Sequence, residues 1–142
     1  MLTQTTPVAS TVHTDDSTAT ARRTVAALGL LGIAMIHLID LPGKFEEGAY
    51  LGVGFIGLII AAVLVAEGLI RRGDRRVWTF AALLSGAIIA GYVISRTVGL
   101  PGAADDIGNW LEPLGLASLF VEGVVVLLSL SAFTRPEKLA AS

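Results

Sequence analysis

The sequence contains no cysteine and few charged residues. The first absence excludes several kinds of site, and the second indicates the environment of the chain. The absence of cysteine among 142 residues excludes disulfides, thiol redox chemistry of the CxxC type and zinc sites built on sulfur. Charged residues make up only 15% of the chain, whereas a soluble domain carries about a quarter. With 54% hydrophobic residues and a mean hydropathy of +0.74, this composition indicates a lipid environment.

Long apolar segments account for most of the chain, and each is long enough to cross the hydrocarbon core of a bilayer as a helix. They cover about residues 24–40, 49–70, 77–98 and 113–133. The alternation of apolar and polar residues that is typical of membrane strands is absent. The sequence therefore predicts an all-α, four-helix transmembrane bundle, and it leaves no room for a separate soluble catalytic domain.

The membrane domain is expected to cover residues 22–135, between two polar tails. Residues 1–21 are rich in Thr, Ser and Ala without apolar periodicity, so we expect a disordered N-terminal tail there. Residues 136–142 are expected to form a short C-terminal tail. The proline and glycine of Leu41-Pro42-Gly43 predict the end of the first span.

The basic residues predict the orientation of the bundle, because eight of the ten fall on one side of the four spans. They are Arg22, Arg23, Arg71, Arg72, Arg75, Arg76, Arg135 and Lys138. By the positive-inside rule, both termini are predicted to be cytoplasmic in a bacterial inner (plasma) membrane. The four arginines between the second and third spans are expected to contact anionic lipid headgroups. Their loop is too short to bind nucleic acid. A cleaved signal at Arg22 and Arg23 is disfavoured, since no small-residue cleavage site follows.

Ionisable side chains inside the spans are few, and each needs a partner or a purpose, because a charge at a helix centre costs about 2.5–3.5 kcal/mol. Glu67 precedes Arg71 by one helical turn, and this spacing predicts a structural ion pair. The other polar groups are expected to form one polar cluster in the outer half of the bundle. Its members are His37, Asp40, Tyr92, Arg96 and Glu122.

Within this polar cluster, the depths of two side chains predict an ion pair between the third and fourth spans. At 1.5 Å per residue, Arg96 begins about 5 Å below the outer surface and Glu122 about 13 Å below it. Side chains tilt toward the N-terminus of their own helix, so Arg96 is expected to lean inward and Glu122 outward. The two tilts would bring the guanidinium and the carboxylate together.

Three interpretations of the polar cluster are open. A buried ion pair that fixes the register of the helices is favoured over a proton or substrate relay that uses His37 and Glu122. A metal site built from His37, Asp40 and Glu46 or Glu47 is the weakest, because one histidine is too few for a typical transition-metal site. We therefore predict no metal and no cofactor.

Two further segments carry a more specific pattern. Residues 92–102 contain Ser-Arg-Thr-Val-Gly-Leu-Pro-Gly, and residues 110–122 contain Trp-Leu-Glu-Pro-Leu-Gly-Leu-Ala-Ser and end in Glu122. With His37-Leu-Ile-Asp-Leu-Pro at the end of the first span, this pattern resembles small four-helix bacterial membrane proteins of actinobacterial type. The resemblance covers about two thirds of the chain. It implies the same fold and one unit containing Arg96 and Glu122, and it brings no activity with it.

The functional expectation follows from what the spans contain. No nucleophile–base pair, phosphate-binding loop or paired catalytic carboxylates can be identified, so the protein is predicted not to be an enzyme. We expect a structural or accessory subunit that packs against the bilayer, a larger membrane complex or a second copy of itself. The alternative is a small transporter or ligand-binding protein that acts as a homo-oligomer. A water-filled cavity open to the outside and reaching Glu122 would favour that alternative.

Overall fold

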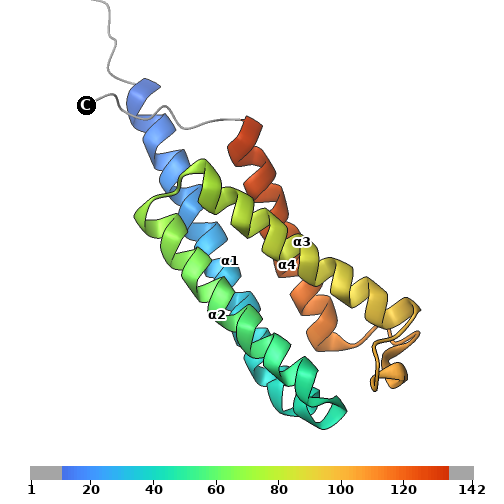
Figure 1. Ribbon diagram of the computed structural model, residues 1–142. Coiled ribbons are helices and arrows are strands. Elements are labelled where there is room, and N and C mark those ends of the chain that lie inside the picture. Colours follow the sequence, from blue (N-terminus) through green and yellow to red (C-terminus); the bar gives the residue numbers. More distant parts are fainter. Residues whose placement is uncertain (1–10, 135–142) are drawn as a thin grey trace, which may run out of the picture.

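The computed structural model describes residues 11–134, with side chains from residue 16 onward, and it is built from four long helices (Figure 1). They are α1 (Thr11–Glu47), α2 (Ala49–Arg71), α3 (Arg75–Thr97) and α4 (Pro113–Thr134). A short 3₁₀ helix, η1 (Ala104–Asp106), lies in the connection of residues 98–112, named here the α3–α4 loop. The described part of the chain is therefore all-α, and its helices form a bundle, as the sequence predicted.

The four helices are long and apolar enough to cross a membrane. Their outward faces carry large apolar side chains. Leu28 on α1, Leu64 on α2, Leu83 on α3 and Phe120 on α4 are each between 61% and 73% exposed. An apolar surface of this extent is unfavourable in water, whereas lipid tails solvate it.

Helix α1 begins earlier than the sequence predicted. It starts at Thr11, so residues 11–21 are helical where we expected part of a disordered tail. Extending a helix by one residue costs far less than starting one, so a helix formed in the apolar span propagates into the polar residues before it. Residues 1–10 and the predicted tail of residues 136–142 lie outside the described residues.

Helix α1 also ends later than predicted, because it continues through Pro42 to Glu47. The prediction that Leu41-Pro42-Gly43 ends this helix was wrong. A proline removes one backbone hydrogen bond, and this loss is tolerated where neighbouring contacts hold the turn. Lys44 provides such contacts, since its ammonium lies 3.9 Å from Asp40 and 2.5 Å from Glu47 on adjacent turns.

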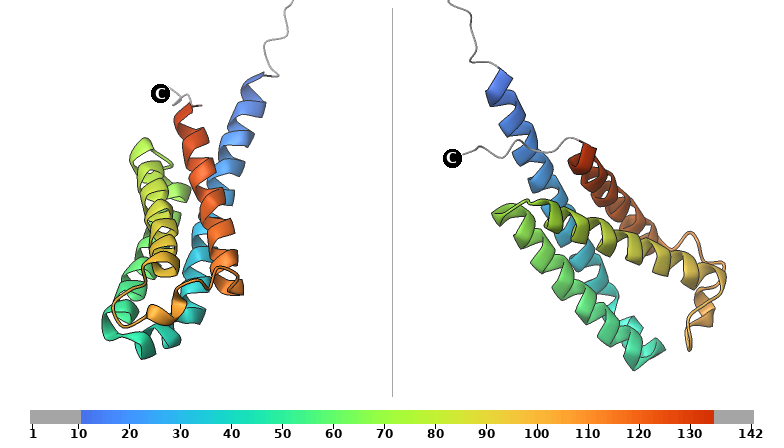
Figure 2. Two further views of the ribbon diagram at one scale, coloured as in Figure 1. Left: turned by 90° about the vertical axis from the view of Figure 1, so that its right-hand side faces the viewer. Right: turned by 45° about the horizontal axis from the view of Figure 1, so that its top comes forward.

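The helices run alternately up and down, and their packing is uneven (Figures 1 and 2). α1 packs along α2 and α4, and α3 packs along α4. α2 and α3 are joined by a tight turn in which Gly73 has a φ of 58° and Asp74 caps α3 by accepting from the Val77 amide at 3.0 Å. From this turn α2 and α3 separate toward their other ends (Figure 1).

The bundle consequently has a packed half and a hollow half. The apolar core lies in the half that contains the α2–α3 turn. Its buried members are Ala26, Ala27, Leu30, Ile33, Ala66, Leu69, Trp78, Ala81, Val125 and Ala132. Most of the buried polar side chains lie in the other half.

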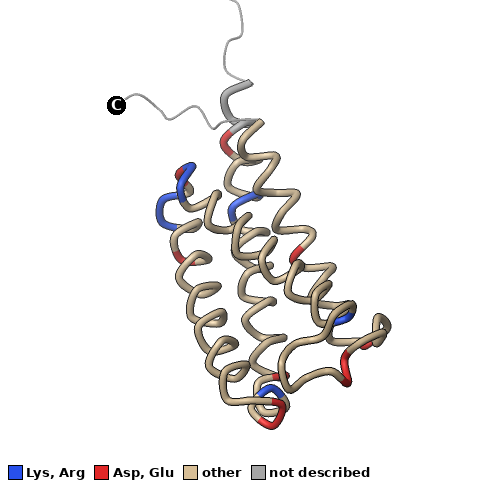
Figure 3. Tube along the Cα trace, turned by 45° about the vertical axis from the view of Figure 1, so that its right-hand side comes forward, with Lys and Arg blue, Asp and Glu red and all other residues tan. Residues whose placement is uncertain are grey.

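The two ends of the bundle differ in charge (Figure 3). The basic end carries the arginines of residues 71–76. Arg22 of α1 also lies there: its guanidinium is 5.7 Å from the centre of the Trp78 ring, and it donates to the Ser131 carbonyl at 3.4 Å. The acidic end carries Glu46, Glu47 and the α3–α4 loop. Arg135 and Lys138, which were also assigned to the basic side, lie outside the described residues.

Candidate ligand-binding cavity

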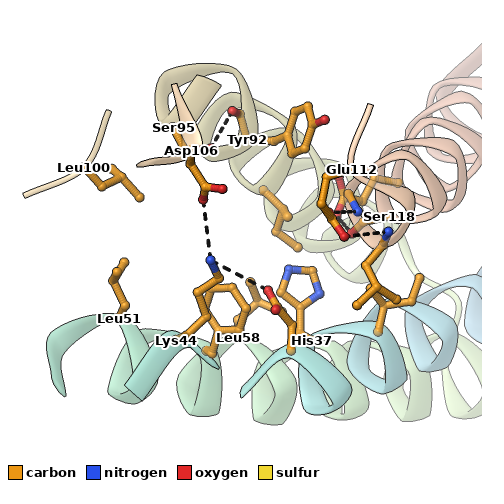
Figure 4. Close-up of a pocket in the computed structure, with 18 of the residues that line it drawn as sticks. His37, Lys44, Leu51, Leu58, Tyr92, Ser95, Leu100, Asp106, Glu112 and Ser118 are labelled. Atoms are coloured by element: carbon orange, nitrogen blue, oxygen red, sulfur yellow. Dashed lines mark hydrogen bonds and ion pairs between the residues drawn. The ribbon is translucent and has the colours of Figure 1, made fainter. Parts of the chain in front are cut away.

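The hollow half of the bundle contains a cavity of about 330 Å³. All five residues of the predicted polar cluster line it: His37, Asp40, Tyr92, Arg96 and Glu122. The charged residues Lys44, Glu47, Asp106 and Glu112 also face it. Its apolar walls include Phe55 and Leu58 of α2 and Leu84 and Ile88 of α3, so it lies between these two helices. Figure 4 shows Leu58 on one side of the cavity and Tyr92 on the other.

Arg96 is paired with the α3–α4 loop. Its Nη1 lies 2.7 Å from the Asp106 carboxylate and its Nη2 lies 3.8 Å from Glu112. The guanidinium also lies 4.7 Å from the centre of the Tyr92 ring, and the side chain is only 6% exposed. Arg96 makes no ion pair with Glu122 in the described part of the chain, so the predicted Arg96–Glu122 pair was wrong.

The error came from the direction of the arginine side chain. Arg96 is one residue from the end of α3, and its guanidinium turns toward the loop that follows. A charged group near the end of an apolar helix costs less free energy than one placed deeper. Arg96 therefore pairs with a carboxylate of the nearby loop and not with the buried carboxylate of Glu122. The difference in depth between Arg96 and Glu122, roughly 9 Å, is therefore not closed.

Lys44 occupies the opposite wall of the cavity and has several acidic neighbours. Its ammonium lies 2.5 Å from Glu47, 3.5 Å from Asp106 and 3.9 Å from Asp40 (Figure 4). The side chain is 13% exposed. Asp106 therefore bridges the two cations of the cavity, Lys44 from α1 and Arg96 from α3.

The α3–α4 loop lies across the acidic end of the bundle (Figure 2). Tyr50 of α2 donates its hydroxyl to the Pro101 carbonyl at 2.5 Å, and Tyr92 of α3 donates to the Trp110 carbonyl at 2.9 Å. The Gly108 amide donates to the Arg96 carbonyl at 2.9 Å. Together with the Asp106 ion pairs, these bonds fix the loop over the cavity.

Glu112 links the loop to the start of α4. Its two carboxylate oxygens accept from the Leu114 amide at 2.9 Å and the Gly115 amide at 2.5 Å, which satisfies two of the free N–H groups at the helix N-terminus. Pro113 at the first position needs no such partner. The carboxylate that caps α4 thus also faces Arg96 and the cavity.

Glu122 is the deepest ionisable group of the cavity and is fully buried, at 0% exposure. Its Oε1 accepts from the Ser118 hydroxyl at 2.5 Å, one helical turn before it. Its Oε2 has no hydrogen-bond partner among the described residues. A buried polar atom without a partner is rare and costly, so this oxygen marks Glu122 as a candidate ligand contact.

His37 lies on the α1 side of the cavity, with its ring pointing into the space (Figure 4). Its Nδ1 lies 2.9 Å from the Ile33 carbonyl, and a carbonyl can only accept, so Nδ1 carries the proton. In the neutral ring, Nε2 is then a free acceptor. The ring packs at 4.9 Å against Phe55 and is only 7% exposed.

Two other sequence hypotheses have clear structural outcomes. No group of three His, Cys, Asp or Glu side chains that could hold a metal occurs in the described residues, so His37, Asp40 and Glu46 or Glu47 are not assembled as a metal site. Glu67 and Arg71 do form the ion pair expected from their spacing, at 2.8 Å. Both side chains are well exposed, so this pair lies on the surface of the bundle.

Sequence reasoning missed Lys44, Asp106 and Glu112 as members of the site. A signal for them was present, because Arg96 stands near the end of its span and is followed at once by an acidic loop. The partners of Arg96 lie on this loop, including the residue before α4, and not on a neighbouring span.

Comparison with known proteins adds no further information about this site, because no family model, curated protein or solved structure matches the chain. The resemblance to small actinobacterial four-helix proteins therefore stays a prediction.

Proposed function

We propose that this chain is a multi-pass bacterial inner-membrane protein that binds a small molecule in its cavity. The observation that carries the proposal is a cavity of about 330 Å³ whose lining includes Glu122, a fully buried residue with an Oε2 that has no hydrogen-bond partner among the described residues. Ligand sites in proteins are concave, mostly apolar and supplied with a few converging polar groups, and their volumes begin at about 300 Å³. The cavity described above has each of these properties.

Insertion in a membrane is supported by the length of the four helices and by the apolar side chains on their outward faces. The proposed orientation places the basic end in the cytoplasm, with both termini there, and the acidic end outside. The cavity would then open toward the outer side, where the α3–α4 loop covers it.

A binding role is favoured over a purely structural one for two reasons. The structural reading relied on an Arg96–Glu122 ion pair to fix register, and Arg96 pairs with Asp106 and Glu112 instead. A protein interior is normally packed without large voids, so a cavity next to a carboxyl oxygen without a partner lowers stability unless something fills it.

Binding is also favoured over conduction across the membrane. The cavity occupies only the acidic half of the bundle, and the apolar core fills the basic half. Leu30, Ile33 and Leu69 in that core are fully buried. A solute that reached Glu122 from the acidic end would therefore meet packed side chains beyond it. We propose binding from one side, without catalysis.

Native mass spectrometry of the protein extracted gently from its own membrane tests this proposal. We expect a discrete small-molecule mass on the wild type, lost in Gly91→Leu and retained in Gly86→Leu. Gly91 lines the cavity and Gly86 does not, while a Cβ at either position meets nothing within 4 Å. The two variants place the same side chain on the same helix, and only Gly91→Leu fills the cavity.

Two results would contradict the proposal. A wild type that carries only lipid, or a ligand mass equally retained by Gly91→Leu, would remove the cavity as a binding site. A stoichiometric partner polypeptide with no small molecule would support an accessory subunit in its place.

A further inference from the structure

We propose that the occupant of the cavity is an organic cation with an apolar body, such as an amphiphilic amine or quaternary ammonium compound. This inference rests on the proposed function and adds the chemical class of the ligand. It is carried by the balance of charge around the cavity, by the polar atoms that remain unpartnered, and by the shape of the apolar walls.

The charged residues that line the cavity carry an excess of negative charge. Five carboxyl groups face it, from Asp40, Glu47, Asp106, Glu112 and Glu122, and even without the buried Glu122 they outnumber the two cations, Lys44 and Arg96. An anionic ligand would be repelled by this excess, and a cationic one would be attracted.

The two cations are already engaged with carboxylates. Asp106 lies 2.7 Å from Arg96 and 3.5 Å from Lys44, and Lys44 also has Glu47 at 2.5 Å. The face of the guanidinium is covered by Tyr92 at 4.7 Å, and Nε is the one buried nitrogen of Arg96 without a hydrogen-bond partner in the described part of the chain. An anion would have to displace these carboxylates from Lys44 and Arg96, which costs free energy. A cationic ligand leaves both ion pairs in place.

The deepest polar side chains of the cavity, Glu122 and His37, offer hydrogen-bond acceptors and not cations. Glu122 Oε2 has no partner among the described residues, and no cation of the described residues pairs with this carboxylate. In its neutral form His37 presents Nε2 as an acceptor, since its Nδ1–H is used by the Ile33 carbonyl. A ligand with N–H donors satisfies both acceptors, and a quaternary ammonium ligand, which has no N–H, still compensates the charge of the carboxylate.

The walls between these acceptors fit an apolar body. Leu58, Leu84 and Ile88 are aliphatic, and Phe55 and Tyr92 present aromatic rings. Aromatic faces stabilise a cationic head in a desolvated site, and the aliphatic walls bury the hydrocarbon part of the same molecule. A compact monocation with one apolar group therefore matches both the charge and the walls.

Calorimetric titration of the full-length protein in lipid nanodiscs tests the inference with three probes of similar shape. They are benzyltrimethylammonium, its neutral carbon isostere neopentylbenzene, and the anion benzylsulfonate. We expect the cation to bind about tenfold or more tightly than the other two, and Glu122→Gln to weaken it by about tenfold or more. Glutamine keeps the size of the side chain and can still bond to Ser118, so the fold is expected to survive.

Asp105→Asn provides the matched control, because it removes one negative charge from the exposed α3–α4 loop without lining the cavity. We expect this variant to bind the cation as the wild type does. Equal weakening by Asp105→Asn and Glu122→Gln would reduce the effect to surface charge and overturn the inference.

The remaining outcomes separate this inference from the proposed function. Equal or tighter binding of neopentylbenzene or benzylsulfonate, blocked by Gly91→Leu, would overturn the charge assignment and leave the cavity as a binding site. An absence of binding by all three probes, with no ligand mass on the native protein, would overturn both.

Discussion

Arg96 Nη1 lies 2.7 Å from Asp106 Oδ2, so a nearly buried cation of helix α3 is neutralised by the loop that immediately follows it. This pairing frees Glu122 from the role of counter-ion. It leaves a fully buried carboxylate facing a cavity in the acidic half of the bundle.

Double-mutant cycles distinguish the observed partner of Arg96 from the one that the sequence suggested. We expect Arg96→Gln and Asp106→Asn to be coupled by about 1–3 kcal/mol in the free energy of unfolding, because the two groups touch. Arg96→Gln and Glu122→Gln should be additive within about 0.5 kcal/mol. Equilibrium unfolding in detergent micelles measures both cycles, and the reverse ranking would restore the Arg96–Glu122 pair.

The close approach of α1 to α4 predicts unequal effects at two glycines. A Cβ on Gly29 would lie 2.7 Å from Val125 Cγ2, whereas a Cβ on Gly57 meets nothing within 4 Å. Gly29→Val should therefore lower the free energy of unfolding by about 1–3 kcal/mol through overpacking, and Gly57→Val should leave it nearly unchanged. Both changes introduce the same side chain into a helix, so equal losses would contradict the observed packing.

Much of the fold was predictable from the sequence. Apolar runs fix the number of membrane-length helices, and Ala49 and Pro113 begin α2 and α4 where they were expected. The end of α1 was not predictable from Pro42, because the contacts of Lys44 hold the helix beyond it.

Five residues that line the cavity were predictable from the sequence, but the way they pair was not. The five residues of the polar cluster do line one cavity, because burial forces polar groups of separate helices inward. Their pairing depends on which way a long side chain such as Arg96 turns and on the path of the α3–α4 loop, and neither leaves a periodic signal. The cavity itself follows from the separation of α2 and α3, which no residue pattern indicated.

The orientation can be tested because the natural sequence contains no cysteine. Single cysteines at Asp105 and at Arg72, both exposed, would mark the acidic and the basic end. A membrane-impermeant thiol reagent should label Asp105→Cys in intact cells and Arg72→Cys only after the membrane is opened. The opposite pattern would contradict cytoplasmic termini.

Lys44 is expected to hold the α3–α4 loop closed. Lys44→Met removes the cation shared by Asp40, Glu47 and Asp106, so these carboxylates repel one another and the loop loses its tie to α1. Hydrogen–deuterium exchange of residues 98–112 should become faster, and Lys44→Arg should stay close to the wild type because it keeps the charge. Unchanged exchange in Lys44→Met would show that Tyr50 and Tyr92 hold the loop without it.

The most direct test of the central claim is chemical labelling of Glu122 with a lipophilic carbodiimide, followed by peptide mass mapping. Such a reagent modifies a protonated carboxyl group that it can reach inside a membrane, and burial without a cation partner favours the protonated form. We predict an adduct on Glu122 in the wild type and in Gly86→Leu, and its loss in Gly91→Leu, where a leucine side chain fills the cavity. An unmodified Glu122 in the wild type, or an adduct equally abundant in Gly91→Leu, would contradict a cavity that reaches this carboxylate.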